Sequence, residues 1–148
     1  MGTISKNFSY REFEESQIAD DHGICNVITS FSVRDAVQAL TLEVLQPLRD
    51  AIGLPVEISS GYRVKALNTL IGGSASSQHM KGEAADIYVP KEDGTRYDSE
   101  QLALVVAALQ LPYDQLIVYE SFIHISHKLK GEQRGRIMFD KSYTGLKV

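Results

Sequence analysis

The sequence predicts an α+β domain in which helices pack on a small, mostly antiparallel sheet. The chain shows a long segment of helical periodicity at 33–52, a later series of short strand-like segments, and one helical segment between those strands. Helices followed by a run of strands are typical of α+β folds. The length of 148 residues fits a single domain, 1–148, which would bury roughly 68–70% of its unfolded surface.

The N-terminal part is predicted to be helical. Ser9 followed by Glu12 forms a capping box, which predicts a short helix over 9–18. Apolar residues recur at helical spacing over 33–52, so we expect an amphipathic helix there. Pro47 lies inside this segment and predicts a kink or a local break, because proline cannot donate a backbone hydrogen bond.

The rest of the chain alternates between short elements and turns. Small polar residues over 74–78 predict a loop, and Asp93-Gly94 predicts a turn within 91–96. The predicted strands are 55–59, 84–89, 115–119, 122–126 and 136–139, and the predicted helices among them are 64–71 and 99–111.

Composition excludes several classes of function. With 15 Lys+Arg against 19 Asp+Glu, the net charge of -4 argues against a nucleic-acid binder. The single cysteine, Cys25, excludes an internal disulfide and any multi-cysteine zinc site, so a metal would need His and carboxylate ligands. No run approaches the ~20 apolar residues of a membrane span, and the N-terminus shows no signal peptide. We therefore expect a chain made in the cytoplasm.

One segment combines a histidine and an aspartate at a spacing that suits a metal site. His79 falls in a predicted loop, and Asp86 falls near the start of the strand predicted after it. Gly82 between them leaves room for a tight return of the backbone, so both side chains can converge on one ion. The alternative is a polar loop whose buried aspartate accepts backbone N–H groups.

A second candidate ligand lies in the predicted strand 122–126. Side chains alternate along a strand, so Phe122, His124 and Ser126 share one face, while His127 belongs to the other. We expect His124 rather than His127 to face the site. The alternative is that His124 is a hydrogen-bonded core histidine. His22, the remaining histidine, follows the first predicted helix and has no predicted role.

Together, His79, Asp86 and His124 would form a three-ligand zinc site with one open position. That arrangement is typical of catalytic zinc, which activates water. Arg63 follows a short strand in the run 60–63 and would bind a substrate carboxylate or stabilise an oxyanion. The alternative for Arg63 is an exposed residue at the start of a helix.

These motifs resemble the zinc D-Ala-D-Ala carboxypeptidase family, the M15 peptidases. The resemblance is carried by Ser77-x-His79-x-x-Gly82-x-Ala84-x-Asp86, with Ser-Gly-Tyr-Arg upstream and Phe-Ile-His-Ile-Ser downstream. Nearly the whole chain is similar to the compact branch found in bacteria and phages. The resemblance implies the DD-peptidase (Hedgehog-like) zinc fold and one Zn²⁺ held by His79, Asp86 and His124.

The resemblance also implies roles around the metal. Arg63, Ser77 and Tyr62 would be substrate-binding residues, Arg63 also serving the transition state and Ser77 supporting the metal site. Related peptidases often place an acidic residue shortly before the last ligand. Glu120, four positions before His124, is therefore the candidate general base, with Asp114 as a second candidate.

The function that the resemblance implies is hydrolysis of an amide bond in the peptide stem of peptidoglycan. A D,D-carboxypeptidase and an endopeptidase of endolysin type both fit. We expect a monomer that binds neither nucleic acid nor membrane and acts on the cell wall after release, which fits a phage or prophage origin. The alternatives are a non-catalytic zinc-bearing module that binds the wall or builds a virion, and a metal-free domain with structural histidines.

Overall fold

The computed structural model describes residues 2–143, so the ends of the predicted domain 1–148 lie outside the described part. The described residues form a mixed α+β fold, as predicted. Its helices are α1 (Tyr10–Glu14), α2 (Gln17–Asp21), α3 (Phe31–Leu40), η1 (Thr41–Leu45), α4 (Gln46–Ile52), α5 (Lys65–Leu70), η2 (Gln78–Lys81) and α6 (Ser99–Ala108). Its strands are β1 (Glu57–Ser60), β2 (Ala84–Tyr88), β3 (Gln115–Val118), β4 (Ile123–Ser126) and β5 (Arg136–Phe139).

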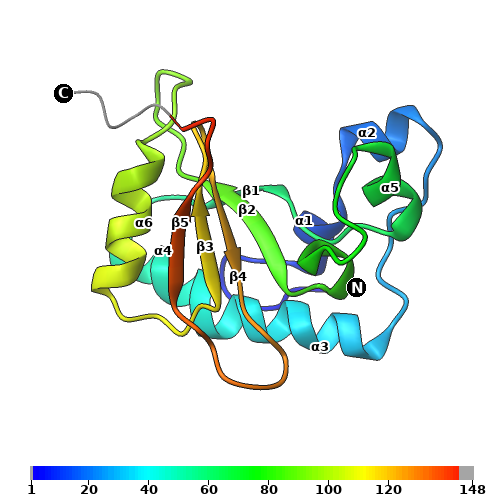
Figure 1. Ribbon diagram of the computed structural model, residues 1–148, viewed down its shortest axis with the longest axis horizontal. Helices are drawn as coiled ribbons and strands as arrows, with labels where there is room; N and C mark the ends of the chain where they lie inside the picture. Colours follow the sequence, from blue (N-terminus) through cyan, green and yellow to red (C-terminus); the bar gives the residue numbers. More distant parts are fainter. Residues whose placement is uncertain (1, 144–148) are drawn as a thin grey trace.

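The five strands form one sheet in the order β1-β2-β4-β3-β5. Every neighbouring pair is antiparallel except β3 and β5, which run parallel. Figure 1 shows α4 and α6 to the left of the sheet, whereas α1, α2 and α5 gather at its right, past β1 and β2. The prediction of a mostly antiparallel sheet is therefore confirmed.

The core lies between one face of the sheet and the long helical segment. Ile87 of β2 and Ile123 and Ile125 of β4 are fully buried against helix residues such as Leu40 and Leu48. Because alternate side chains of a strand point to opposite faces, burying the isoleucines of β4 directs His124 to the other face. The packing of the core thus determines which side chains of β2 and β4 face away from it and can form a site.

The predicted helix 33–52 forms as α3, η1 and α4 in succession, and its hydrogen-bonding pattern changes from α to π in the middle. Residues Thr41–Leu45 form a π turn, in which the N–H of Gln46 donates to the carbonyl of Thr41. Pro47 cannot donate, and its ring would press on the carbonyl four residues earlier, so the wider turn relieves that conflict. The local break predicted from Pro47 is confirmed as this π turn.

Two helix predictions are wrong in part: one predicted helix is divided in two, and the other ends earlier than predicted. The segment 9–18 forms two short helices because Glu15 is extended (φ -64°, ψ 131°) and Ser16 then caps α2 by accepting the N–H of Ala19. The helix predicted over 99–111 ends at Ala108, because Gln110 adopts a left-handed φ of 55°.

One loop prediction also needs correction. The last residue of the loop predicted over 74–78, Gln78, begins the 3-10 turn η2, which carries His79.

Within residues 2–143, no helix is long and apolar enough to cross a membrane.

Candidate metal centre

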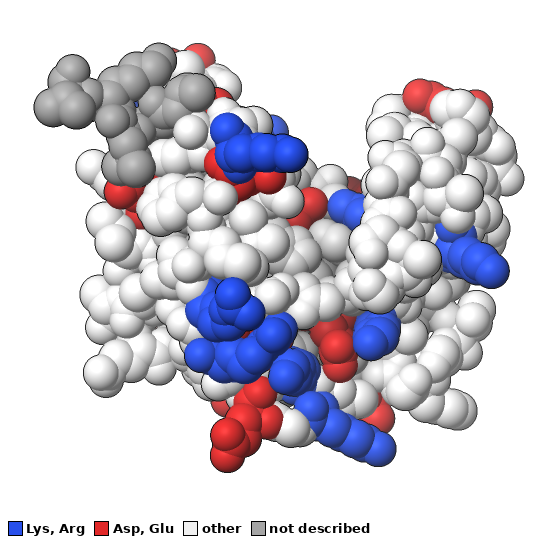
Figure 2. Space-filling model, in the orientation of Figure 1, with Lys and Arg blue, Asp and Glu red and all other residues white. Residues whose placement is uncertain are grey.

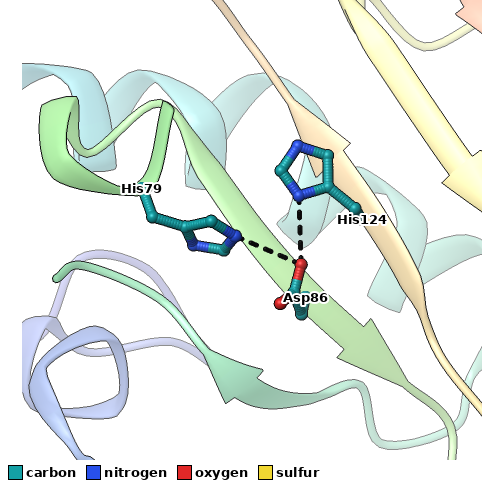
Figure 3. Close-up of side chains that lie close together, drawn as sticks. All are labelled: His79, Asp86 and His124. Atoms are coloured by element: carbon teal, nitrogen blue, oxygen red, sulfur yellow. Dashed lines mark hydrogen bonds and ion pairs between the residues drawn. The ribbon is translucent and has the colours of Figure 1, made fainter. Parts of the chain in front are cut away.

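Strands β2 and β4 bring Asp86 and His124 together. The two strands are antiparallel, and Asp86 is the direct partner of His124 in their register. Directly opposite residues share one face of a sheet. The side chains of both residues therefore point to the face away from the isoleucine core, where Figure 3 shows them converging.

The turn η2 supplies the third side chain of this cluster. Ser77 caps the turn by accepting the N–H of His79, and Gly82 ends it with a φ of 73°. A Cβ at Gly82 would lie 2.7 Å from the carbonyl oxygen of Val33 in α3. Only glycine adopts this φ at low cost and also permits this close approach. The tight return of the chain carries His79 over the start of β2, as expected from Gly82.

Three ligand atoms meet at this point. His79 Nε2 lies 3.3 Å from Asp86 Oδ1, and His124 Nδ1 lies 3.1 Å from the same oxygen. Each of the three residues offers one ligand atom, and these atoms all lie within 4.8 Å of one another. The structure thus brings together all three residues proposed as metal ligands.

The second nitrogen of each ring faces an oxygen atom. His79 Nδ1 lies 2.7 Å from the carbonyl oxygen of Gly61, and His124 Nε2 lies 3.0 Å from Oε1 of Gln78. Metal-binding histidines typically donate their outer N–H to such an oxygen. Two imidazole nitrogens and one carboxylate oxygen are also a donor set that catalytic zinc uses. The residues present therefore fit a zinc ion.

The charge of Asp86 is stabilised by its neighbours. Burial on its own raises the pKa of this carboxyl group, but hydrogen bonds with His124 and His79 outweigh burial, and the net pKa lies below its usual value of 3.8. Asp86 is consequently a carboxylate at neutral pH. A buried carboxylate beside two imidazoles is suited to binding a divalent cation.

Arg63 lies beside this carboxylate and contacts three side chains. Its Nε donates to Ser60 Oγ at 3.0 Å, and its terminal nitrogens lie 3.4 Å from Asn68 Oδ1 and 3.5 Å from Asp86 Oδ2. Its side chain is 13% exposed. Burial lowers the pKa of Arg63, although the charge of Asp86 opposes that effect, and arginine remains cationic. The structure therefore places one oriented cation next to the candidate metal ligands.

A cavity of about 540 Å³ opens above the cluster. Its walls include Tyr119 and Phe122, whose rings stack at 4.5 Å on either side of the β3–β4 turn. The lining residues are Arg63, Gly73, Ser74, Ser76, Ser77, Gln78, His79, Asp86, Gln115, Ile117, Tyr119, Phe122 and His124. The cavity is large enough for a small peptide segment, since ligand pockets typically measure about 300–1,000 Å³.

Two residues predicted for the site do not line this cavity. Tyr62 packs against the core, and its backbone N–H donates to the carbonyl of Phe13. Glu120 is exposed in the two-residue β3–β4 turn, which the hydrogen bond from Tyr119 N–H to the Phe122 carbonyl closes. A substrate contact by Tyr62 and catalysis by Glu120 stay predictions.

The second candidate base, Asp114, also lies outside the cavity. Its carboxylate is fully buried and accepts hydrogen bonds from Nε, a terminal nitrogen and the backbone N–H of Arg134. These contacts give it a structural role in holding the segment between β4 and β5. Within residues 2–143, Asp86 is the only carboxylate among the cavity-lining residues.

Sequence reasoning missed the aromatic pair and Gln78. Tyr119 and Phe122 flank Glu120, so a hairpin turn at 120–121 would have predicted that their side chains share one face. Gln78 lies between Ser77 and His79, but its partner His124 is 46 positions away. No local sequence pattern predicts a contact between residues so far apart in the chain.

Comparison with protein families identifies the region of the chain that contains this cluster. A model of the family described as Peptidase M15 matches residues 6–126, which is most of the chain. The chain belongs to the M15 peptidase family. The matched region contains all three candidate ligands and Arg63, so the M15 match and the side-chain cluster concern the same part of the chain.

One curated protein similar to this chain is the zinc D-Ala-D-Ala carboxypeptidase of Streptomyces albus G. The two proteins are 32% identical over 82 residues, which is 55% of this chain and 31% of the relative. The chain thus spans about a third of the length of that relative.

Proposed function

We propose that this M15 peptidase is a zinc metallopeptidase that hydrolyses an amide bond in the peptide stem of peptidoglycan. The observation that carries the proposal is the convergence of His79 Nε2, Asp86 Oδ1 and His124 Nδ1 within 4.8 Å at the floor of an open cavity. The similarity to a zinc D-Ala-D-Ala carboxypeptidase supports both the metal and the class of substrate.

The proposed metal is one Zn²⁺ ion held by His79, Asp86 and His124. Bound by three protein ligands, zinc activates water and polarises the carbonyl group of a substrate. The chain's own contribution is to hold the two imidazoles and the carboxylate in place before the ion arrives. The hydrogen bonds on the outer ring nitrogens serve that purpose.

Arg63 is the residue proposed to stabilise charge on the substrate. Its guanidinium lines the cavity and is fixed by Ser60, Asn68 and Asp86, so it need not reorganise when negative charge develops on the carbonyl oxygen. A preorganised donor of this kind lowers the barrier in acyl-transfer reactions. The same group can hold a terminal carboxylate of a peptide.

Glu120 is proposed to move protons during the reaction. The aromatic residues on both sides of its turn line the cavity, which places the turn at the cavity's rim. A carboxylate at the rim would take a proton from the attacking water and return it to the leaving amine. This role requires the Glu120 side chain to turn over the cavity when substrate is bound.

The charges around the cavity support an anionic peptide as substrate. A groove of about 480 Å³ adjoins the cavity and shares Ser76 and Gln78 with it. Figure 2 shows Lys and Arg side chains gathered near the segment that connects β4 and β5. The cations that line the groove are Lys81, Lys128, Lys130 and Arg134. Stem peptides carry free carboxylates, which such a groove would attract.

The experiment that tests the proposal combines metal analysis with product analysis. We expect about one zinc per chain and, by mass spectrometry of digested muropeptides, new products that differ from the substrate by hydrolysis of one amide bond. Release of a terminal amino acid identifies a carboxypeptidase, whereas separation of a cross-link identifies an endopeptidase. Stoichiometric zinc with unchanged muropeptides would favour the non-catalytic module instead.

A further inference from the structure

The two candidate histidine ligands differ in how their outer nitrogens are supported. His79 Nδ1 faces a backbone carbonyl, that of Gly61, at 2.7 Å. His124 Nε2 instead faces a side chain, Oε1 of Gln78, at 3.0 Å. A backbone oxygen is always present, whereas the oxygen at His124 depends on the identity of residue 78.

This contact favours a proton on Nε2 of His124, because the amide oxygen of Gln78 can only accept a hydrogen bond. A neutral imidazole has one N–H and one lone pair, and the partner of the N–H must be an acceptor. With Nε2–H donating to the amide oxygen of Gln78, Nδ1 is the nitrogen left to face the ligand cluster, where it would present its lone pair to a bound zinc ion. That nitrogen is the one that lies 3.1 Å from Asp86 Oδ1, on the side where the ligand atoms meet.

We propose that Gln78 is a positioning residue that fixes the ring orientation and the tautomer of His124 for zinc binding. The inference rests on the proposed zinc site and adds a residue to which no role in it has been assigned. Gln78 also lies beside His79 in η2, so one short turn provides one ligand and orients a second ligand on β4.

The contact between Gln78 and His124 also helps to hold η2 against β4. Its contact with His124 joins η2 to β4, two elements that are far apart in the sequence. Ser77 caps η2 and thereby sets the direction of both Gln78 and His79. The distance between the two histidine ligands therefore depends on a side-chain hydrogen bond as well as on the sheet.

The test compares three variants of the full chain. Gln78→Leu removes the acceptor at similar size, Gln78→Glu keeps an oxygen acceptor, and Ser76→Ala alters a neighbouring cavity residue as a control. Zinc affinity is measured by competition with a chromophoric chelator. We expect Gln78→Leu to bind zinc about 10- to 100-fold more weakly, as loss of such a partner typically does. Gln78→Glu and Ser76→Ala should stay within about 3-fold of the wild type or bind more tightly.

A spectroscopic readout separates positioning from a general loss of structure. Long-range proton–nitrogen NMR spectra of the zinc-loaded protein report the protonated nitrogen of His124, and circular dichroism reports folding. We expect Nε2–H in the wild type and in Gln78→Glu, and a broadened or altered His124 ring signal in Gln78→Leu with unchanged circular dichroism.

Two results would overturn the inference. If the wild type binds zinc and Gln78→Leu binds it within about 2-fold with the same His124 signal, Gln78 has no positioning role and the proposed function stands. If the wild type itself binds no zinc, the inference fails together with the proposed zinc peptidase. The wild-type measurement therefore distinguishes the two failures.

Discussion

At the scale of single residues, the site depends on how each polar group is paired before any substrate arrives. Asp86 contacts both histidines and Arg63, so one buried carboxylate organises three other side chains. Arg63 in turn is anchored by Ser60. Because these groups are already oriented, substitutions in the network should separate metal binding from catalysis.

Arg63→Ala should lower kcat about 100- to 1,000-fold while zinc stays bound at one ion per chain. The reason is that removing one preorganised donor from an oxyanion site costs about 2.7–4 kcal/mol of transition-state stabilisation. Muropeptide hydrolysis and zinc content are measured on the same samples. Loss of zinc from this variant would show that Arg63 supports the metal ligands rather than the substrate.

Glu120→Gln tests the proposed general base. We expect at least a 100-fold loss of kcat with zinc content and stability unchanged, which is within the usual effect of removing a general base. Ser121→Ala, in the same exposed turn, serves as the control and should keep full activity. Retained turnover in Glu120→Gln would assign the proton transfer to a group that lines the cavity, such as Tyr119.

At the scale of elements, short connections position the site more than long ones do. The turn η2 and Gly82 return the chain onto β2, and the β3–β4 turn places two aromatic rings at the cavity wall. The segment between β4 and β5 is held by the buried Asp114. Each of these connections can be weakened by a substitution that leaves the three candidate metal ligands unchanged.

Gly82→Ala should destabilise the fold more than Gly94→Ala does. Both glycines have a positive φ, 73° and 88°, but only at Gly82 would the new Cβ lie 2.7 Å from a backbone oxygen. Strain at such a φ alone costs of order 1–3 kcal/mol. We expect Gly82→Ala to exceed the control by about 1 kcal/mol or more in urea unfolding, as overpacking typically costs. Equal losses would mean that α3 shifts to accept the methyl group.

Asp114 should make the fold sensitive to acid. Its hydrogen bonds with Arg134, opposed by burial, lower its pKa from 3.8 to about 2. A carboxyl group whose pKa is lower in the folded state stabilises the fold above its unfolded pKa. That stability should be lost as the pH falls from about 4 to about 2.

Asp114→Asn is the matching variant for this pH dependence. We expect it to lose about 1–3 kcal/mol at neutral pH, since a buried charge-assisted contact is weakened. Its free energy of unfolding should then change less than that of the wild type between about pH 4 and pH 2. Denaturant unfolding at several pH values measures both quantities, and parallel curves for the two proteins would contradict the assignment.

At the scale of the whole molecule, the distribution of charge matters more than its sum. The chain has a formal net charge of -4, yet the groove beside the cavity is lined by four cations, Lys81, Lys128, Lys130 and Arg134, and by one half-buried acid, Glu83. Two of these cations, Lys128 and Arg134, form ion pairs with the buried Asp114, so the excess positive charge comes mainly from Lys81 and Lys130. The local surface is therefore suited to anionic peptides although the protein as a whole is acidic. Composition alone could exclude a broadly basic surface but could not locate this one.

The double variant Lys81→Gln/Lys130→Gln should lower kcat/KM for carboxylate-bearing stem peptides about 2- to 30-fold. Each exposed charge pair contributes about 0.2–1 kcal/mol, and added salt screens it. The variant should also show a weaker dependence on ionic strength. Lys6→Gln/Lys141→Gln, which removes two exposed lysines outside the groove, should behave like the wild type. Equal effects of the two double variants would point to net charge alone.

The sequence by itself determined the family, the α+β class and the three candidate ligands. Those features are local: a ten-residue motif, the periodicity of a helix, and the alternation that turns His124 away from the core side of β4. The tertiary structure decided the parallel pairing of β3 with β5, the exposed position of Glu120 outside the cavity lining, and the contact of Gln78 with His124. Such contacts join residues far apart in the chain, and only the packed fold sets their distances.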